Sequence, residues 1–371
     1  MTTGSAGRLR SLDIFRGFTI AAMVLVNNPG APPAYAQLEH AEWHGWTFTD
    51  TIFPFFMWIV GVALTLSTAR RVERGDDKRH LLLHIARRAA VIFLLGFLLS
   101  PFPFIDWATI RIPGVLQRIA VCYLIAGIIF LYTSARAQLL WAAGLNALYW
   151  ALMTLYPTPG CGAGSLTKDC NFARYVDSLF LSGHMWRATK FWDPEGIVST
   201  LPAISTVLFG VLAGHLLRRW SQPGQRLKRL FGWGLALVAA SHLLARLMPF
   251  NKSIWTTPFA LLMAGLAMIS FGAWYWAADV KGWARWFKPF EIFGMNAIVL
   301  YLMSGMVAKF MSRVKVAMDG TQVSLHGWYM KNVCLAVASP INASLLYALS
   351  NVLLIFLIGW VMWKRGWFVK V

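Results

Sequence analysis

The chain of 371 residues is 58% hydrophobic and only 13% charged, whereas soluble domains are about 25% charged. This much apolar sequence excludes an ordinary soluble domain and indicates a protein that crosses a membrane several times. The net charge of +19 would also suit a nucleic-acid-binding protein. The basic residues instead form short clusters between apolar segments, which is typical of membrane topology, so we expect no nucleic-acid partner.

Apolar segments follow one another along the whole chain, and each approaches the roughly 20 residues that a helix needs to cross a bilayer. They are too long for the strands of a membrane barrel. We therefore expect an all-α polytopic membrane protein of about ten transmembrane helices in a single domain, residues 1–371. The predicted helices cover residues 12–28, 51–69, 82–100, 115–133, 137–155, 197–217, 229–248, 255–277, 289–311 and 345–363.

The distribution of basic residues predicts how the helices are oriented. If the ten segments alternate in direction, the basic clusters all fall on one side, which the positive-inside rule makes cytoplasmic. Both termini are then cytoplasmic, with residues 1–11 as a short tail. The loops 156–196 and 312–344 and the segment around His40 lie on the opposite side, and the second loop is expected to hold an interfacial helix near residues 326–338. The clusters are 8–10, 70–79, 218–229, 281–288 and 364–370, with Arg136.

The first apolar segment could be read as a cleaved signal peptide, because Ala34-Tyr35-Ala36 has the small-x-small form of a cleavage site. Asp13 and Arg16 interrupt its apolar region, however, so we expect a retained helix. Asp13, Arg16 and Asn27 fall on one helix face at 100° per residue. This polar stripe predicts a surface turned to the protein interior; the alternative is a structural ion pair between Asp13 and Arg16.

A histidine lies between the first two predicted helices, in the segment Leu38-Glu39-His40-Ala41-Glu42-Trp43-His44. An imidazole is the side chain best suited to move a proton near neutral pH. Asp50 could fix the tautomer of that ring, or it could simply cap the second helix. A loop histidine at the headgroup boundary is the plainer alternative. His44 is a second imidazole close by.

Further polar residues stand at helix ends or inside apolar segments. Gln117 and Arg118 open the fourth predicted helix, and Asn251 and Lys252 form the short turn before the eighth. Asn296 falls near the middle of the ninth, where an amide needs a partner.

Arg87 and Arg88 lie in the inner part of the third predicted helix. They could bind the phosphates of a nucleotide or extend toward lipid headgroups.

The four cysteines suggest one disulfide and no metal site. Cys161 and Cys170 share an outward loop, where an oxidising compartment would permit a bond, and two free thiols are the alternative. No Cys/His spacing typical of a metal site is present, so we assign no metal.

Six motifs in this chain resemble the heparan-α-glucosaminide N-acetyltransferase family, in order and from residue 8 to about residue 300. Arg8-Leu9-Arg10-Ser11-Leu12-Asp13-Ile14-Phe15-Arg16-Gly17, followed by Val26-Asn27, is similar to the family's opening. The other motifs are His40-Ala41-x-Trp43-x-Gly45-x-Thr47-x-x-Asp50-x-x-Phe53-Pro54, Gly114-Val115-Leu116-Gln117-Arg118, Asp193-Pro194-Glu195-Gly196, Asn251-Lys252-x-x-Trp255 and Gly294-Met295-Asn296.

The resemblance implies a transmembrane enzyme that moves an acetyl group from cytoplasmic acetyl-CoA to an amino sugar on the far side. His40 inherits the catalytic role, with Asn27 and Asp50. Acetyl-CoA is expected to contact Asp13, Arg16, Arg87, Arg88 and Asn296. The sugar is expected to contact Glu39, Trp43, Gln117, Arg118, Asp193, Glu195, Asn251 and Lys252. The family also suggests a homodimer.

Two departures from the family concern the acceptor. No large luminal domain precedes the first predicted helix, and the stretch from Asn27 to His40 is slightly longer. We expect a bacterial inner-membrane enzyme that acetylates a glucosamine-type sugar from the periplasm, His40 acting as base or acetyl carrier. The alternatives are a sugar or small-solute transporter and an O-acetyltransferase of envelope polysaccharide.

Overall fold

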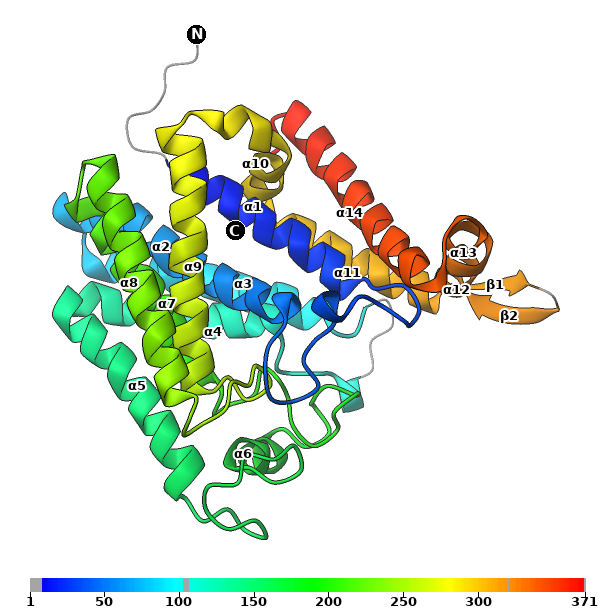
Figure 1. Cartoon of the computed structure of the whole chain (residues 1–371), viewed down its shortest axis with the longest axis horizontal. Coiled ribbons are helices and arrows are strands. Elements are labelled where there is room, and N and C mark those ends of the chain that lie inside the picture. Colours follow the sequence, from blue (N-terminus) through cyan, green and yellow to red (C-terminus); the bar gives the residue numbers. More distant parts are fainter. Residues whose placement is uncertain (1–8, 103–106, 319, 370–371) are drawn as a thin grey trace.

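The computed structural model describes residues 9–102, 107–318 and 320–369, so residues 1–8 of the predicted tail lie outside the described part. Helices occupy every range that the sequence analysis assigned to a membrane span (Figure 1). The long helices are α1 (Arg10–Asn27), α2 (Phe48–Glu73), α3 (Lys78–Leu99), α4 (Val115–Tyr132), α5 (Ala135–Leu155), α7 (Thr200–Arg219), α8 (Pro223–Leu244), α9 (Thr257–Tyr275), α11 (Ala297–Arg313) and α14 (Pro340–Lys364).

Short elements join these helices. They are η1 (Ala36–Leu38), η2 (Trp107–Thr109), α6 (Phe172–Phe180), the π-helix η3 (Trp276–Val280), η4 (Trp283–Phe287), α10 (Lys288–Met295), α12 (Leu325–Tyr329), the π-helix η5 (Met330–Cys334) and α13 (Leu335–Val337). The nearly continuous run from α12 to α13 confirms a helix near 326–338, and its place at a membrane interface stays a prediction.

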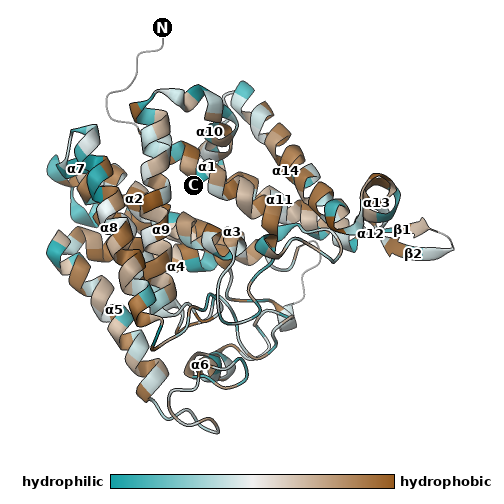
Figure 2. Ribbon diagram, in the orientation of Figure 1, coloured by the Kyte–Doolittle hydropathy of each residue, from teal (hydrophilic) through white to brown (hydrophobic). Residues whose placement is uncertain are grey.

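Six of the described helices are long and apolar enough to cross a membrane, and seven if a bent pair counts as one span. The six are α2, α3, α4, α7, α9 with η3, and α14. The helices α1, α5 and α8 fall short of the same measure; α1, for example, carries Arg10, Asp13 and Arg16 in its first two turns. Figure 2 shows apolar residues along the helices and polar residues at their ends and in the loops. A multi-pass membrane protein follows, with a span count of six to seven by this measure.

The structure differs from the sequence prediction in two places. The ninth predicted helix is broken at Asn296 into α10 and α11, and the segment from Trp283 to Arg313 bends there by 74°. The loop 312–344 contains a hairpin, so the fold is not purely α-helical. Its strands β1 (Lys315–Met318) and β2 (Thr321–Ser324) are antiparallel, with Lys315 opposite Ser324 and Met318 opposite Thr321.

The helices pack most closely in pairs: α8 with α9, α2 with α7, α1 with α10, and α3 with α4. Glycines permit the closest approaches. A Cβ atom at Gly17 would lie 1.6 Å from the Phe290 carbonyl oxygen, and one at Gly294 would lie 2.0 Å from the Asp13 carbonyl oxygen. Only glycine lets the α1 and α10 backbones meet at this distance. Phe15, Trp58 and Phe271 fill the centre where α1, α2 and α9 meet, with ring centroids 5.6–6.5 Å apart.

Hydrogen bonds and ion pairs join several helix ends. At one end, Asp279 accepts hydrogen bonds from the amides of Arg10 and Ser11 and so caps α1, while Arg10 also bonds Glu291. At the C-terminal ends of α7 and α2, Arg218 pairs with Glu73 at 2.6 Å. The connections that carry His40, Lys252 and Asp193 gather at the opposite helix ends, beside α6 (Figure 1).

Candidate functional site

His40 is held by the start of α2. Thr47 caps this helix, and Asp50 completes a capping box by accepting a hydrogen bond from the Thr47 amide at 3.0 Å. The other carboxylate oxygen of Asp50 lies 2.6 Å from Nδ1 of His40. Both predicted roles of Asp50 are therefore present in one side chain: it caps the helix and it holds the imidazole.

This geometry determines which ring nitrogen of His40 is available. A carboxylate only accepts hydrogen bonds, so the proton between Asp50 and His40 lies on Nδ1 and Nε2 of the neutral ring carries the lone pair. Asp50 is 1% exposed, whereas the His40 side chain is 51% exposed. Asp50 also accepts a bond from the Ala41 amide at 3.1 Å, which fixes the backbone beside the ring. The result is an oriented, half-exposed imidazole whose Nε2 makes no hydrogen bond to a described residue.

The turn between α8 and α9 completes the cluster. Nζ of Lys252 lies 3.4 Å from Oδ1 of Asp50 and 3.1 Å from Nδ1 of His40. Nδ2 of Asn251 lies 3.3 Å from Nδ1 of His44, and the Gly45 amide donates to the Phe250 carbonyl at 2.8 Å. Residues more than 200 positions apart in the chain thus form one site. Burial lowers the pKa of Lys252, and the carboxylates of Asp50 and Glu195 oppose that effect.

A second charged group stands beside this cluster. Arg111 donates to Asp193 at 2.8 and 2.5 Å and to Glu195 at 2.5 Å. Burial alone would lower the pKa of Arg111, but the two carboxylates outweigh burial and raise it. The carboxylate of Glu195 also raises the pKa of Lys252, so the Arg111 ion pairs and the His40 cluster interact electrostatically. The sequence analysis missed Arg111, and the available signal was a basic residue in the short connection before the fourth predicted helix.

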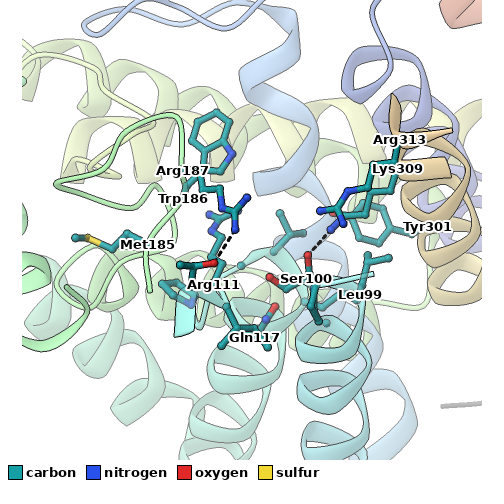
Figure 3. A pocket seen from close by; sticks show the side chains of 18 residues that line it. Leu99, Ser100, Arg111, Gln117, Met185, Trp186, Arg187, Tyr301, Lys309 and Arg313 are labelled. Atoms are coloured by element: carbon teal, nitrogen blue, oxygen red, sulfur yellow. Dashed lines mark hydrogen bonds between the residues drawn. The ribbon is translucent and has the colours of Figure 1, made fainter. Parts of the chain in front are cut away.

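Arg118 and Gln117 stand at the base of this network, at the start of α4. Arg118 is 2% exposed, donates to the Gly196 carbonyl at 3.1 Å and to the Ser199 hydroxyl, and lies over the Trp255 ring at 5.2 Å. Its Nε and Nη1 have no hydrogen-bond partner among the described residues. Gln117 borders a cavity of about 370 Å³ between α3, α4 and α11 (Figure 3).

The loop between α5 and α7 covers the site from one side. Trp43 donates its indole N–H to the Leu166 carbonyl at 2.8 Å and packs edge-to-face on Trp192. A disulfide joins Cys161 to Cys170 in this loop, which confirms the predicted pair. Asp177 of α6 accepts from the amides of Ile197 and Asp193 at 2.9 and 3.2 Å. Burial raises the pKa of Asp177 to about 6, although both amide bonds oppose the rise.

Two residues that the sequence analysis assigned to the site make no side-chain hydrogen bond to the His40 cluster among the described residues. Asn27 ends α1 with an exposed side chain that makes no hydrogen bond to a described residue, whereas the neighbouring Asn28 is buried. Glu39 is also exposed and contributes only its carbonyl, which accepts from the Thr47 hydroxyl at 2.6 Å. Neither contacts His40 through a hydrogen bond.

The residues assigned to acetyl-CoA are dispersed. Asp13 and Arg16 form the ion pair that was the structural alternative, at 3.3 Å, and Arg16 also approaches the Gly294 carbonyl at 3.4 Å. Asn296 binds the chain's own C-terminal segment: its Nδ2 donates to the Trp367 carbonyl at 3.0 Å, and its Oδ1 accepts from the Val369 amide at 2.9 Å.

The two arginines of α3 are placed elsewhere. Arg88 lies 5.4 Å from the centre of the Tyr123 ring of α4, and Arg87 is exposed. The described residues therefore do not gather these five side chains into one nucleotide site.

A multi-pass helical membrane protein with an oriented histidine at one end of its bundle is the class that the fold and the site define. The chain matches the family model described as heparan-alpha-glucosaminide N-acetyltransferase, catalytic, over residues 8–243. That match covers more than half of the sequence, and the chain belongs to this family.

Two curated relatives agree with the family match. The chain is 31% identical to human heparan-alpha-glucosaminide N-acetyltransferase over 353 residues and 30% identical to the mouse protein over 356 residues. Each alignment covers 80% of this chain but 52% and 53% of the human and mouse proteins. The chain thus spans about half the length of these relatives.

Proposed function

We propose that this protein is a transmembrane N-acetyltransferase, which moves the acetyl group of cytoplasmic acetyl-CoA to the amine of a glucosamine-type sugar on the periplasmic side of a bacterial inner membrane. One observation carries the proposal: Asp50 holds Nδ1 of a half-exposed His40, which leaves Nε2 available to a reactant. Family membership supplies the class of donor and acceptor. Acetyl-CoA is a substrate here, and the proposal assigns no metal.

The chemistry requires a base near neutral pH. In direct transfer, the sugar amine attacks the thioester carbonyl, Nε2 of His40 takes the amine proton, and that proton leaves with the CoA thiol as the C–S bond breaks. In the two-step route, Nε2 attacks the thioester first and CoA leaves as the thiolate. The amine then attacks the acetyl-imidazole, the bond from the acetyl carbon to Nε2 breaks, and the freed Nε2 takes the amine proton. Both routes develop an oxyanion that needs hydrogen-bond donors, and Asn27 is assigned this role.

The acceptor sugar is proposed to lie against the polar wall around His40. Lys252, Asn251 and Arg118 offer hydrogen-bond donors, while Asp193 and Glu195 are held in place by Arg111. Glu39, Trp43 and Gln117 complete this set. The unpartnered Nε and Nη1 of Arg118 support the assignment, because a buried guanidinium with unmet donors gains from a polar ligand.

The donor is proposed to enter from the opposite end of the bundle, along Asp13, Arg16 and Asn296, with Arg87 and Arg88 nearer its phosphates. A bilayer core is about 30 Å thick, so the pantetheine arm would carry the acetyl group inward while the nucleotide stays at the cytoplasmic rim. In this orientation, the loops 156–196 and 312–344 are periplasmic. We propose that residues 1–371 form one catalytic domain and that the protein assembles as a homodimer.

Acetyl transfer to glucosamine by the purified full chain tests the proposal. His40→Gln should lower turnover by about 10²–10⁴-fold, the usual contribution of a general base. His242→Gln is the matched control, because His242 is an exposed imidazole on α8 that bonds its own helix at the Val238 carbonyl. Near-normal turnover of His40→Gln would refute the assignment, and transfer to sugars that carry only hydroxyls would replace it with O-acetylation.

A further inference from the structure

A polar cavity opens beside the His40 cluster, at the same helix ends. Its walls come from the end of α3, the start of α4, the connection that holds Arg111, the segment around Trp186, and α11 (Figure 3). Its volume of about 370 Å³ falls in the range of small-molecule sites, which begin at roughly 300 Å³.

The lining is strongly cationic. Lys309 and Arg313 project from successive turns of α11, and Arg111 and Arg187 face them from the other wall (Figure 3). None of the described residues that line the cavity is acidic. Like charges four residues apart on a helix repel each other. An anion between these walls would offset that repulsion.

The partners of these cations differ in charge. Asp193 and Glu195 neutralise Arg111. Lys309 donates to the Ser100 carbonyl, a neutral oxygen, and neither Lys309 nor Arg313 pairs with a carboxylate among the described residues. Arginine and lysine side chains make their strongest hydrogen bonds to carboxylate and phosphate groups. The α11 pair is therefore matched to an anionic ligand.

Arg111 connects this cavity to the histidine. It borders the cavity and bonds Glu195, and Glu195 in turn acts on Lys252, which contacts His40. A ligand that fills the cavity thus lies beside Arg111, whose partner Glu195 acts electrostatically on the lysine next to the imidazole. The donor route begins at the other end of the bundle, so this anion is not a phosphate of acetyl-CoA.

We infer that Lys309 and Arg313 bind an anionic group, a carboxylate, phosphate or sulfate, that the acceptor carries in addition to its amine. The inference rests on the proposed function and narrows its substrate to anionic amino sugars. The same chemistry could come from a lipid headgroup phosphate, and the experiment separates the two sources.

Binding and transfer should be measured with glucosamine and glucosamine 6-phosphate, using the full chain in nanodiscs of zwitterionic lipid. We expect glucosamine 6-phosphate to have the lower KM. Lys309→Gln and Arg313→Gln should each raise the ratio of its KM to that of glucosamine at least about tenfold, as loss of one charge-assisted contact implies. Lys315→Gln, which removes an exposed lysine of β1 and changes net charge equally, should leave the ratio unchanged.

Isothermal titration keeps the inference testable if transfer itself fails, because binding needs no chemistry. Tighter binding of glucosamine 6-phosphate than of glucosamine, lost in Lys309→Gln, supports the site even in an inactive chain. Equal affinities for the two sugars, or equal effects of the variant on both, overturn it. If nanodiscs containing phosphatidylglycerol abolish the difference, the cavity holds a lipid headgroup and the acceptor assignment is wrong.

Discussion

Two polar regions of this protein contrast in how they satisfy their own side chains. Around His40, one oxygen of Asp50 holds Nδ1 of a half-exposed imidazole, and its other oxygen accepts from the Thr47 amide at the start of α2. Along α1 and α10, Asp13 pairs with Arg16 and Asn296 is occupied by the C-terminal segment. Polar residues in a membrane protein are all candidates for function. The contacts show which ones keep a group available for a ligand.

After substitution of His40 itself, the largest expected effect on turnover comes from separating the two roles of Asp50. An asparagine at this position could still accept the Thr47 amide hydrogen bond of the capping box through its side-chain oxygen, but it lacks the charge that stabilises an imidazolium. Asp50→Asn should therefore cost about 10–100-fold in turnover, as loss of a residue that orients a catalytic or ligating histidine does, with little change in melting temperature. A large loss of stability with normal turnover would show that Asp50 acts only as a cap.

The close contact between α1 and α10 should be the more sensitive region for folding. Gly17→Ala puts a methyl group 1.6 Å from the Phe290 carbonyl oxygen, so the helices must separate. We expect a loss of about 2–3 kcal/mol in the free energy of unfolding, measured by thermal unfolding in detergent. Gly144→Ala in α5 is the control, because no atom lies within 4 Å of its added Cβ. Equal stabilities of the two variants would contradict the packing described here.

Asp177 should make the loop side of the molecule sensitive to pH. Burial raises its folded pKa to about 6, above the unfolded value of about 3.9. The folded state therefore binds the proton more tightly, and stability falls as pH rises from about 4 to about 6. The destabilisation at pH 7 should be on the order of 3 kcal/mol, because each pKa unit corresponds to about 1.4 kcal/mol. Unfolding of Asp177→Asn from pH 4 to 7 should lack this slope; an unchanged slope would assign it to other groups.

The smallest effect is expected at Asn296, which is proposed to contact acetyl-CoA but binds the C-terminal segment in this structure. If acetyl-CoA uses this amide, the segment after Arg365 must leave it, so deletion of residues 366–371 should lower the KM for acetyl-CoA about two- to fivefold. The KM for glucosamine should stay the same. An increased or unchanged KM for acetyl-CoA would show that the Asn296 contacts are structural. Asn296 would then differ from His40 in having no group available to a ligand.

Hydropathy and charge were enough to place the helices, because a buried backbone in lipid must be helical. The break at Asn296 was not predictable, since it depends on a C-terminal segment 71 residues away in sequence. The hairpin carried a local signal, the dipeptide Asp319-Gly320 between short polar–apolar alternations. The sequence analysis considered only the length of apolar segments and therefore did not predict the hairpin.

The candidate site was predictable where side chains interact locally. Asp50 stands three residues after the capping Thr47, so sequence indicated both of its roles. Lys252 and Arg111 depend on long-range packing. The sequence predicted Lys252 through its motif and missed Arg111, which has none. Helical periodicity placed Asn27 with Asp13 and Arg16, but it could not show that α1 ends at Asn27 and leaves that side chain exposed.

The contact between Lys252 and His40 also determines at what stage of synthesis the site can form. During synthesis, His40 emerges early and Lys252 follows 212 residues later, after the helices from α2 to α8 have been made. An unfinished chain therefore carries the histidine without its lysine partner. Reactivity toward thioesters should arise only once the α8–α9 hairpin is inserted, which ties the onset of chemistry to the late stages of membrane assembly.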